Sequence, residues 1–406
     1  MTGSNTVFEK APKKRVRLHA IDVYRALTML LMIFVNDLWT LQETPKWLDH
    51  VPAGVDGLGL ADVVFPAFLF IVGLSIPYAI SNRKSKGDSD TQILAHIVIR
   101  SLALIIMGVF HVNLESYNSE LALLPKPAWQ ILITIGFFLV WMDYSRWEKV
   151  QFKPYLQGLG IVLLIGLAAI YQGGPMDEPT WMRPKWWGIL GLIGWGYLIV
   201  SLIYLICQEN KNALWMSFLL LVSFHVMEKS GFLGFLSTIR PYIWLIDNGA
   251  TPVSCMGGVI VSIYFREWFS TNYRNRFWIF LLIGALLSVV LGLITRPIWG
   301  IHKIGSSPSW VWICLGISMA VYGAMIWLVE LKGKKSWFDF IKPAGTSTLT
   351  CYLLPYVHYA LLSLSALYLP IWLRTGGVGI IKSLFYAIGI ILVTGLLEKV
   401  KIRLKV

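Results

Sequence analysis

The chain has 406 residues, a length that in a soluble protein would correspond to two or three domains. Hydrophobic residues make up 56% of it and charged residues only 14%, whereas soluble domains carry about 25% charge. This leaves too little polar surface for a water-soluble fold, and it also excludes disordered, collagen-like and disulfide-scaffold proteins. We predict an all-α polytopic membrane protein.

Apolar segments long enough to cross a bilayer, about 17–25 residues each, follow one another along the chain. We predict 11–12 transmembrane helices, because two of the twelve candidate segments are short. A basic segment, residues 1–20, precedes a single transmembrane domain, residues 21–406. The candidate segments are 21–41, 60–81, 93–113, 127–142, 155–172, 187–207, 213–227, 251–268, 277–296, 311–330, 347–369 and 378–398.

Basic residues set the predicted orientation. With the N-terminus in the cytoplasm, the inward-facing segments hold 24 Lys and Arg residues and the outward-facing segments hold 10. Cytoplasmic loops of membrane proteins carry this excess, so the N-terminus is predicted to be cytoplasmic and residues 42–59 to face outward. The same bias accounts for the net charge of +13. No basic stretch is interleaved with aromatic residues as in nucleic-acid-binding segments, and we expect no nucleic-acid partner.

The first segment carries three polar residues on one helical face. Asp22 and Arg25 are three residues apart, and Asn36 follows eleven residues after Arg25. Eleven residues correspond to about three full turns, so all three side chains share a face. Ionisable groups inside a membrane are costly, which makes each a candidate for function. The alternatives are a neutralising Asp22–Arg25 ion pair and an interhelical hydrogen bond from Asn36.

The next polar positions are His50, in the outward loop, and Asp62, at the start of the second segment. Asp62 could simply cap its helix. An imidazole that an acidic neighbour orients, however, can act as a general base or a nucleophile near neutral pH. Weaker candidates are His111, Asn113, Gln130 and the outward segment that contains His302, Lys303, Ser306 and Ser307. No metal-ligand spacing, nucleotide-binding loop or hydrolase elbow is present, and we predict no metal site.

The stretch from Arg17 through Pro77 contains RLHAIDVYRALTMLLMIFVND and then WLDHVPAGVDGLGLADVVFPAFLFIVGLSIP. It resembles the heparan-α-glucosaminide N-acetyltransferase family, including its bacterial members, in its D-x-x-R, V-N, H, G-L-x-x-A-D-x-V-F-P and F-I-x-G-x-S signatures. Weaker similarity continues around residues 108–113 and Gln130, at SPSW (307–310) and at KPAGTSTLTCY. Three departures occur: Ala26 replaces a glycine, DLWTLQETPKWLD replaces a Gly-rich stretch, and the D-P-E-G segment is only Asp247-Asn248-Gly249.

The resemblance implies transfer of the acetyl group of acetyl-CoA to the amine of glucosamine or a terminal glucosaminide. The catalytic residues of the family correspond to His50, Asn36 and Asp62. We expect contacts with acetyl-CoA from Arg25, Asp22, Asn113 and Gln130, with Arg25 suited to the phosphates. His50 would be a general base or an acetyl carrier, and Asn36 could stabilise the oxyanion.

Two other functional classes fit the same polar residues. An amino-sugar transporter would use His50 as a substrate or proton contact and would consume no acetyl-CoA. A structural membrane protein would use the polar residues only to join helices.

Expected partners are acetyl-CoA, an amino-sugar acceptor, the lipid bilayer and a second copy in a homodimer. The expected location is the bacterial cytoplasmic (inner) membrane.

Overall fold

The computed structural model describes residues 18–147, 150–239, 242, 249–269, 271 and 273–406. Most of the basic segment 1–20 and two residues of the expected Asp247-Asn248-Gly249 motif lie outside this range. The described residues form helices and isolated β-bridges but no strand, which confirms the all-α class. The helices are α1 (His19–Asp37), α2 (Leu60–Lys84), α3 (Asp90–Asn113), α4 (Lys126–Trp141), α5 (Lys153–Ala169), α6 (Ile189–Cys207), α7 (Lys211–Lys229), α8 (Ala250–Trp268), α9 (Arg274–Trp299), α10 (Pro308–Met325), α11 (Lys342–Thr346), α12 (Thr348–Ser365) and α13 (Gly376–Lys399).

Each of the twelve predicted segments coincides with one of these helices, and only the short α11 was not predicted. Among the described residues, six helices are long and apolar enough to cross a membrane: α2, α3, α6, α9, α13 and α10 with its π-helical continuation to Leu331. The apolar helices α4 and α5 are shorter. The molecule is an integral membrane protein, and the number of membrane crossings stays a prediction.

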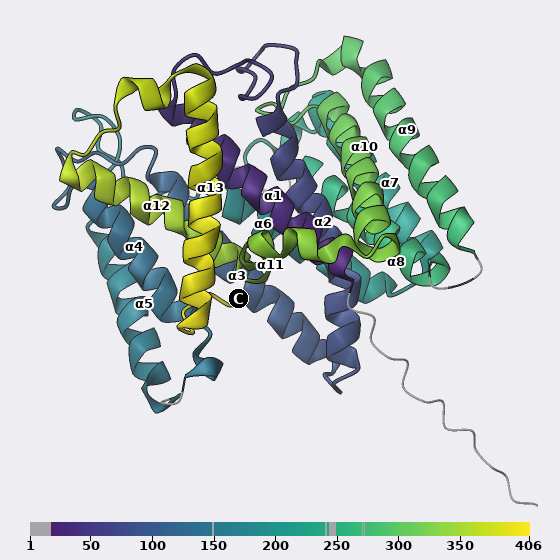
Figure 1. Ribbon diagram of the computed structural model, residues 1–406, viewed down its shortest axis with the longest axis horizontal. Coiled ribbons are helices and arrows are strands. Elements are labelled where there is room, and N and C mark those ends of the chain that lie inside the picture. The colour runs from purple at the N-terminus through teal and green to yellow at the C-terminus, as the bar shows by residue number, and fades with distance from the viewer. Residues whose placement is uncertain (1–17, 148–149, 240–241, 243–248, 270, 272) are drawn as a thin grey trace, which may run out of the picture.

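Helix α1 lies at the centre of the bundle, in contact with α2, α10, α11, α12 and α13. Figure 1 shows α4 and α5 on one side of this centre and α9 and α10 on the other. The segment between α1 and α2 lies at one end of the helices, which we call the outer end. The C-terminal end of α13 lies at the opposite, inner end. Which of the two ends faces the cytoplasm stays a prediction.

Close packing against α8 fixes the position of α2. A Cβ atom on Gly73 would lie 1.8 Å from the carbonyl oxygen of Cys255, and one on Gly258 would lie 2.1 Å from that of Phe70. Neither position can therefore carry a side chain without moving a helix. Small residues allow such an approach, which is how membrane helices gain van der Waals contact in the absence of a hydrophobic driving force. The outer end of α2, with Asp62, is held in place by this contact.

Candidate active site

The candidate active site is centred on His50 and Asp62. The Asp62 Oδ1 atom lies 2.8 Å from Nδ1 of His50. Its other oxygen accepts hydrogen bonds from the backbone N–H groups of Val51 at 3.1 Å and Gly59 at 3.0 Å. The Asp62 side chain is 1% exposed and that of His50 is 41% exposed. Asp62 therefore caps α2 and also orients an imidazole that remains open to solvent.

A lysine from a distant part of the chain completes this site. Lys303, in the segment between α9 and α10, places Nζ 3.0 Å from Nδ1 and 3.1 Å from Nε2 of His50. Partial burial lowers the pKa of the Lys303 ammonium, although the Asp62 carboxylate opposes this effect. The sequence marks Lys303 as polar and outward-facing, but its spacing of 253 residues from His50 conceals the contact.

Two loops bind each other and so bring Lys303 to His50. Asp56 accepts a hydrogen bond from the backbone N–H of Ile301 at 2.8 Å and one from Arg296 Nε at 2.9 Å. These two donors lower the pKa of the Asp56 carboxyl. In return, Gly57 N–H donates to the Ile301 carbonyl at 3.1 Å. Trp310, in the first turn of α10, donates from Nε1 to the Asp62 carbonyl at 3.1 Å.

Asn36 lies at the outer end of α1 with an exposed side chain, and among the described residues no hydrogen bond joins it to His50 or Asp62. Its neighbour Asp37 is buried instead. Asp37 accepts hydrogen bonds from Tyr359 at 2.5 Å, from Lys382 at 2.6 Å and from Ser383 at 2.6 Å. This network ties α1 to α12 and α13. Sequence reasoning missed Asp37, although an acid at the end of an apolar segment was a usable signal.

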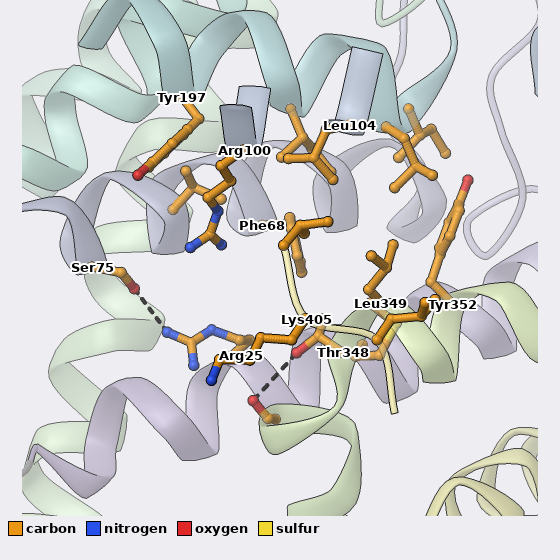
Figure 2. Close-up of a pocket in the computed structure, with 18 of the residues that line it drawn as sticks. Arg25, Phe68, Ser75, Arg100, Leu104, Tyr197, Thr348, Leu349, Tyr352 and Lys405 are labelled. Atoms are coloured by element: carbon orange, nitrogen blue, oxygen red, sulfur yellow. Dashed lines mark hydrogen bonds between the residues drawn. The ribbon is translucent and has the colours of Figure 1, made fainter. Parts of the chain in front are cut away.

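A cavity of about 410 Å³ runs along the inner part of the same helices. Its α1 wall is formed by Arg25, Met29 and Met32, and the same helical face continues one turn outward to Asn36. Figure 2 shows Arg25 and Arg100 pointing into one end of the cavity, while Leu104, Leu349 and Tyr352 lie at the other. One end is therefore cationic and the other apolar.

Three cationic side chains line the cavity, and no acidic side chain does so among its described lining residues. Arg25 donates to Ser75 Oγ at 2.8 Å and pairs with Asp22 at 3.3 Å. Arg100 stacks over the Tyr197 ring at 4.9 Å, and its buried Nε has no hydrogen-bond partner in the described part of the chain. The third cation is Lys405. This arrangement suits an anionic ligand.

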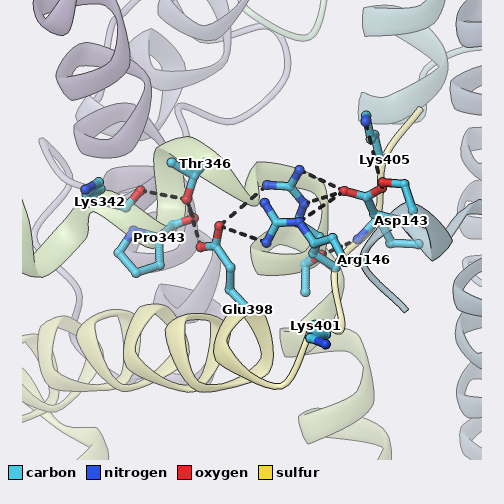
Figure 3. A network of polar contacts seen from close by, with 12 residues as sticks. Asp143, Arg146, Lys342, Pro343, Thr346, Glu398, Lys401 and Lys405 are labelled. Atoms are coloured by element: carbon cyan, nitrogen blue, oxygen red, sulfur yellow. Dashed lines mark hydrogen bonds and ion pairs between the residues drawn. The ribbon is translucent and has the colours of Figure 1, made fainter. Parts of the chain in front are cut away.

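The C-terminal residues form one wall of the cavity, which includes Leu404, Lys405 and Val406. A polar network at the inner end holds this segment (Figure 3). Asp143 accepts two hydrogen bonds from Arg403, at 3.0 and 2.8 Å, and Arg403 also pairs with Glu398 at 3.5 Å. Burial favours the neutral form of Asp143, but hydrogen bonds from Ser145 and Arg403 outweigh it and lower the pKa of the carboxyl.

The other expected acetyl-CoA contacts lie apart from the cavity. Asn113 donates to the carbonyl oxygens of Val109 and Arg183 at 2.7 and 2.9 Å, and Gln130 donates to that of Tyr356 at 2.7 Å. Neither residue lines the cavity. Asp22 is not among the lining residues, but it pairs with Arg25, which is. Within the described ranges, no three His, Cys, Asp or Glu side chains gather in a way that could hold a metal ion.

Comparisons with known proteins match part of the chain. Residues 17–246, more than half of the chain, match the family model described as "Domain of unknown function (DUF5009)". The protein named heparan-alpha-glucosaminide N-acetyltransferase from Mus musculus is 38% identical over 153 residues, which are 37% of this chain and 18% of the relative. The protein of the same name from Homo sapiens is 36% identical over 149 residues, with the same shares.

The chain thus spans less than a fifth of the length of either curated relative, 18% in both matches. The two matches confirm the resemblance to heparan-α-glucosaminide N-acetyltransferases over part of the chain. The match of more than half of the chain shows that the protein belongs to the DUF5009 family.

Proposed function

We propose that the protein is a membrane-embedded acetyltransferase that moves the acetyl group of acetyl-CoA to the amine of glucosamine or a terminal glucosaminide. The names of the two relatives support an N-acetyltransferase family. The observation that carries the proposal is the His50–Asp62 pair at the outer end of α2. In this pair a buried carboxylate orients an imidazole that is partly exposed to solvent. The inner part of the same helix lines a cationic cavity.

The His50–Asp62 pair suits proton transfer at Nε2. With the Nδ1 proton donated to Asp62, Nε2 of His50 keeps a lone pair that can accept a proton. In direct transfer, Nε2 takes the proton of the attacking amine and later gives it to the departing CoA sulfur. In the alternative, Nε2 attacks the thioester itself and carries the acetyl group to the amine. Both routes yield an N-acetyl amide and free CoA thiol.

The cavity suits acetyl-CoA as the donor. Arg25, Arg100 and Lys405 would bind its phosphates at the inner end, where the cytoplasmic pool is available. The apolar part would hold the pantetheine arm. From Arg25 to Asn36 the α1 face extends over eleven residues, about 16 Å, so an extended arm would bring the thioester toward the outer end. Asn36 would then donate to the acetyl oxygen.

The remaining parts of the proposal concern the surroundings of the reaction. The acceptor meets His50 from the outer side, and the membrane is the bacterial cytoplasmic membrane. Asn113 and Gln130, whose amides bond backbone carbonyls, would shape the bundle around the donor rather than touch it.

Acetyl transfer by the detergent-purified protein tests the proposal. Release of free CoA thiol should require glucosamine and vanish in His50→Ala, while His96→Ala, which alters a histidine of α3 that does not line the cavity, should retain it. Release without glucosamine, once per protein, would identify the acetyl-carrier route. No thiol release with any amino sugar, combined with uptake of one into proteoliposomes, would overturn the proposal in favour of transport.

A further inference from the structure

Lys303 contacts the imidazole of the site although the motifs that point to acetyl transfer do not include it. Its Nζ is 3.0 and 3.1 Å from the two ring nitrogens of His50. The Nδ1 proton serves the hydrogen bond to Asp62, so Nε2 carries the lone pair, and the Lys303 ammonium lies 3.1 Å from that nitrogen. A positively charged donor therefore lies within hydrogen-bond distance of the atom at which the proposed chemistry begins.

The position of Lys303 is fixed by the loop that carries it. Its carbonyl accepts from Ser306 N–H at 2.9 Å, and the Ser307 hydroxyl accepts from His302 N–H at 3.0 Å and donates to the Gly300 carbonyl at 2.8 Å. The His302 ring contacts the Val55 carbonyl at 3.0 Å. A donor on a rigid support costs little reorganisation when charge develops beside it.

Among the described residues, no hydrogen bond joins the other candidate donors to the His50 ring. Asn36 is exposed and has no hydrogen bond to His50 in the described structure. Arg296 is bound to Asp56, while Arg25 and Arg100 lie along the inner cavity. Partial burial lowers the pKa of the Lys303 ammonium, and a more acidic N–H group is a stronger donor.

We propose that Lys303 is a further catalytic residue whose ammonium donates a hydrogen bond to the acetyl carbonyl oxygen as that oxygen becomes negative. The inference rests on the proposed acetyl transfer. In the direct route the amine nitrogen bonds to the thioester carbon, its proton passes to His50 Nε2, and the carbonyl oxygen takes up the electron pair beside Lys303. When the C=O bond re-forms, the C–S bond breaks and the thiolate receives the proton from His50.

The same charge would select the reactive form of the acceptor. An ammonium beside Nε2 repels a protonated amine, which has no lone pair, and leaves the neutral amine, which is the nucleophile. Lys303 would thereby favour binding of the neutral amine, which His50 can deprotonate as the amine attacks the thioester.

Lys303→Met tests the proposal because it keeps the length of the side chain and removes the charge. The kcat for acetyl transfer should fall about 10²–10³-fold, as when a single oxyanion donor is removed elsewhere. The KM for acetyl-CoA should stay within about threefold, because uniform ground-state binding is unchanged. Lys303→Arg should retain activity to within about tenfold, since it keeps a cationic donor.

Chemical rescue separates this role from a structural one. Lys303→Cys treated with 2-bromoethylamine regains an ammonium at nearly the original distance and should recover most of its kcat. Lys303→Ala treated in the same way controls for the native thiols, of which Cys255, Cys314 and Cys351 are buried. Recovery in the Cys variant alone supports the proposal.

Two results would overturn the inference while acetyl transfer stands: a kcat within threefold of the wild type in Lys303→Met, or a loss that appears only in the KM of the acceptor. Absence of transfer in the wild-type protein itself would instead remove the proposed function, and the inference with it.

Discussion

The Asp62 carboxylate binds the His50 imidazole and the first turn of its own helix at the same time. Oδ1 lies 2.8 Å from the ring Nδ1, while Oδ2 accepts the Gly59 N–H group at 3.0 Å. The orientation of the imidazole is therefore coupled to the start of α2, and α2 is fixed in turn by its contact with α8. A single buried acid thus links the reactive group to the helical scaffold.

Asp62→Asn should nearly abolish activity without unfolding the protein. The amide can donate to Nδ1, which forces the proton onto Nε2 and removes the lone pair that acts as the base. A change of tautomer of this kind in a hydrolytic triad lowers kcat about 10⁴-fold. The measurement is kcat for thiol release alongside the melting temperature. The control is Asp49→Asn, because the Asp49 side chain accepts from the backbone N–H of His50 and, among the described residues, does not contact the ring. Equal losses in both variants would contradict a special role for Asp62.

Arg100→Met should weaken binding of the CoA nucleotide. Charge-assisted hydrogen bonds contribute about 1.5–3 kcal/mol, so the Kd for adenosine 3′,5′-bisphosphate should rise about 10–100-fold. Arg276→Met is the matched control, because Arg276 also stacks on a tyrosine ring, that of Tyr273 at 4.4 Å, but lies outside the cavity. Isothermal titration in detergent measures both. An unchanged Kd in Arg100→Met would show that the phosphates of the nucleotide bind at another site.

The fall in kcat at alkaline pH should reflect deprotonation of the Lys303 ammonium. Burial lowers the pKa of its ammonium below the ordinary value of 10.5, so the charge is lost at a lower pH than in a free lysine. Asp62, His50 and Cys314 are the other titratable groups facing it. If the ammonium is required, kcat should fall as pH rises toward 10.5, and Lys303→Arg should move this fall upward because arginine stays protonated. If kcat of Lys303→Arg falls at the same alkaline pH as that of the wild type, the fall is caused by deprotonation of another group.

The Asp37 network should matter for stability. Asp37→Ala leaves the Lys382 ammonium, 16% exposed, without its carboxylate partner. Removing one member of a buried pair costs about 3–5 kcal/mol, whereas replacing both by apolar residues is often neutral. Thermal unfolding followed by tryptophan fluorescence should show a clear drop for Asp37→Ala and partial recovery for Asp37→Ala with Lys382→Met. A double variant less stable than the single one would indicate that Lys382 has other partners of equal weight.

Gly73→Ala should damage the scaffold that carries Asp62. The new methyl group would overlap the Cys255 carbonyl, and α2 would have to move away from α8. A loss of about 1–3 kcal/mol is typical of an overpacked interior. Gly166→Ala on α5, where no atom lies within 4 Å of the added carbon, should be neutral or stabilising. Equal melting temperatures for Gly73→Ala and Gly166→Ala would show that α2 can move away from α8 without loss of stability.

The fold could be predicted from the sequence because hydropathy alone marks segments that must be helical in a membrane. The twelve predicted segments all coincide with helices, and Asp62 with His50 followed from their closeness along the chain. The short α11 was not predicted, because five residues within a polar segment carry no such signal.

Contacts between distant segments could not be predicted. Lys303 reaches His50 because the two loops bind each other, through Asp56 and the backbone of the later loop among other contacts, which no spacing reveals. Arg100 and Lys405 meet Arg25 in one cavity through the packing of α3 and the return of the C-terminal residues. The shared face of Arg25 and Asn36, in contrast, followed from helical periodicity alone.

The central claim is that one reaction path connects the inner cationic cavity with His50 at the outer end. Proteoliposomes of uniform orientation, with acetyl-CoA inside and glucosamine outside, test it most directly. The account predicts N-acetylglucosamine in the external medium, at a rate that depends on His50 and on Arg100. Product that forms only when both substrates are on the same side of the membrane, or glucosamine that enters the vesicles unacetylated, would contradict it.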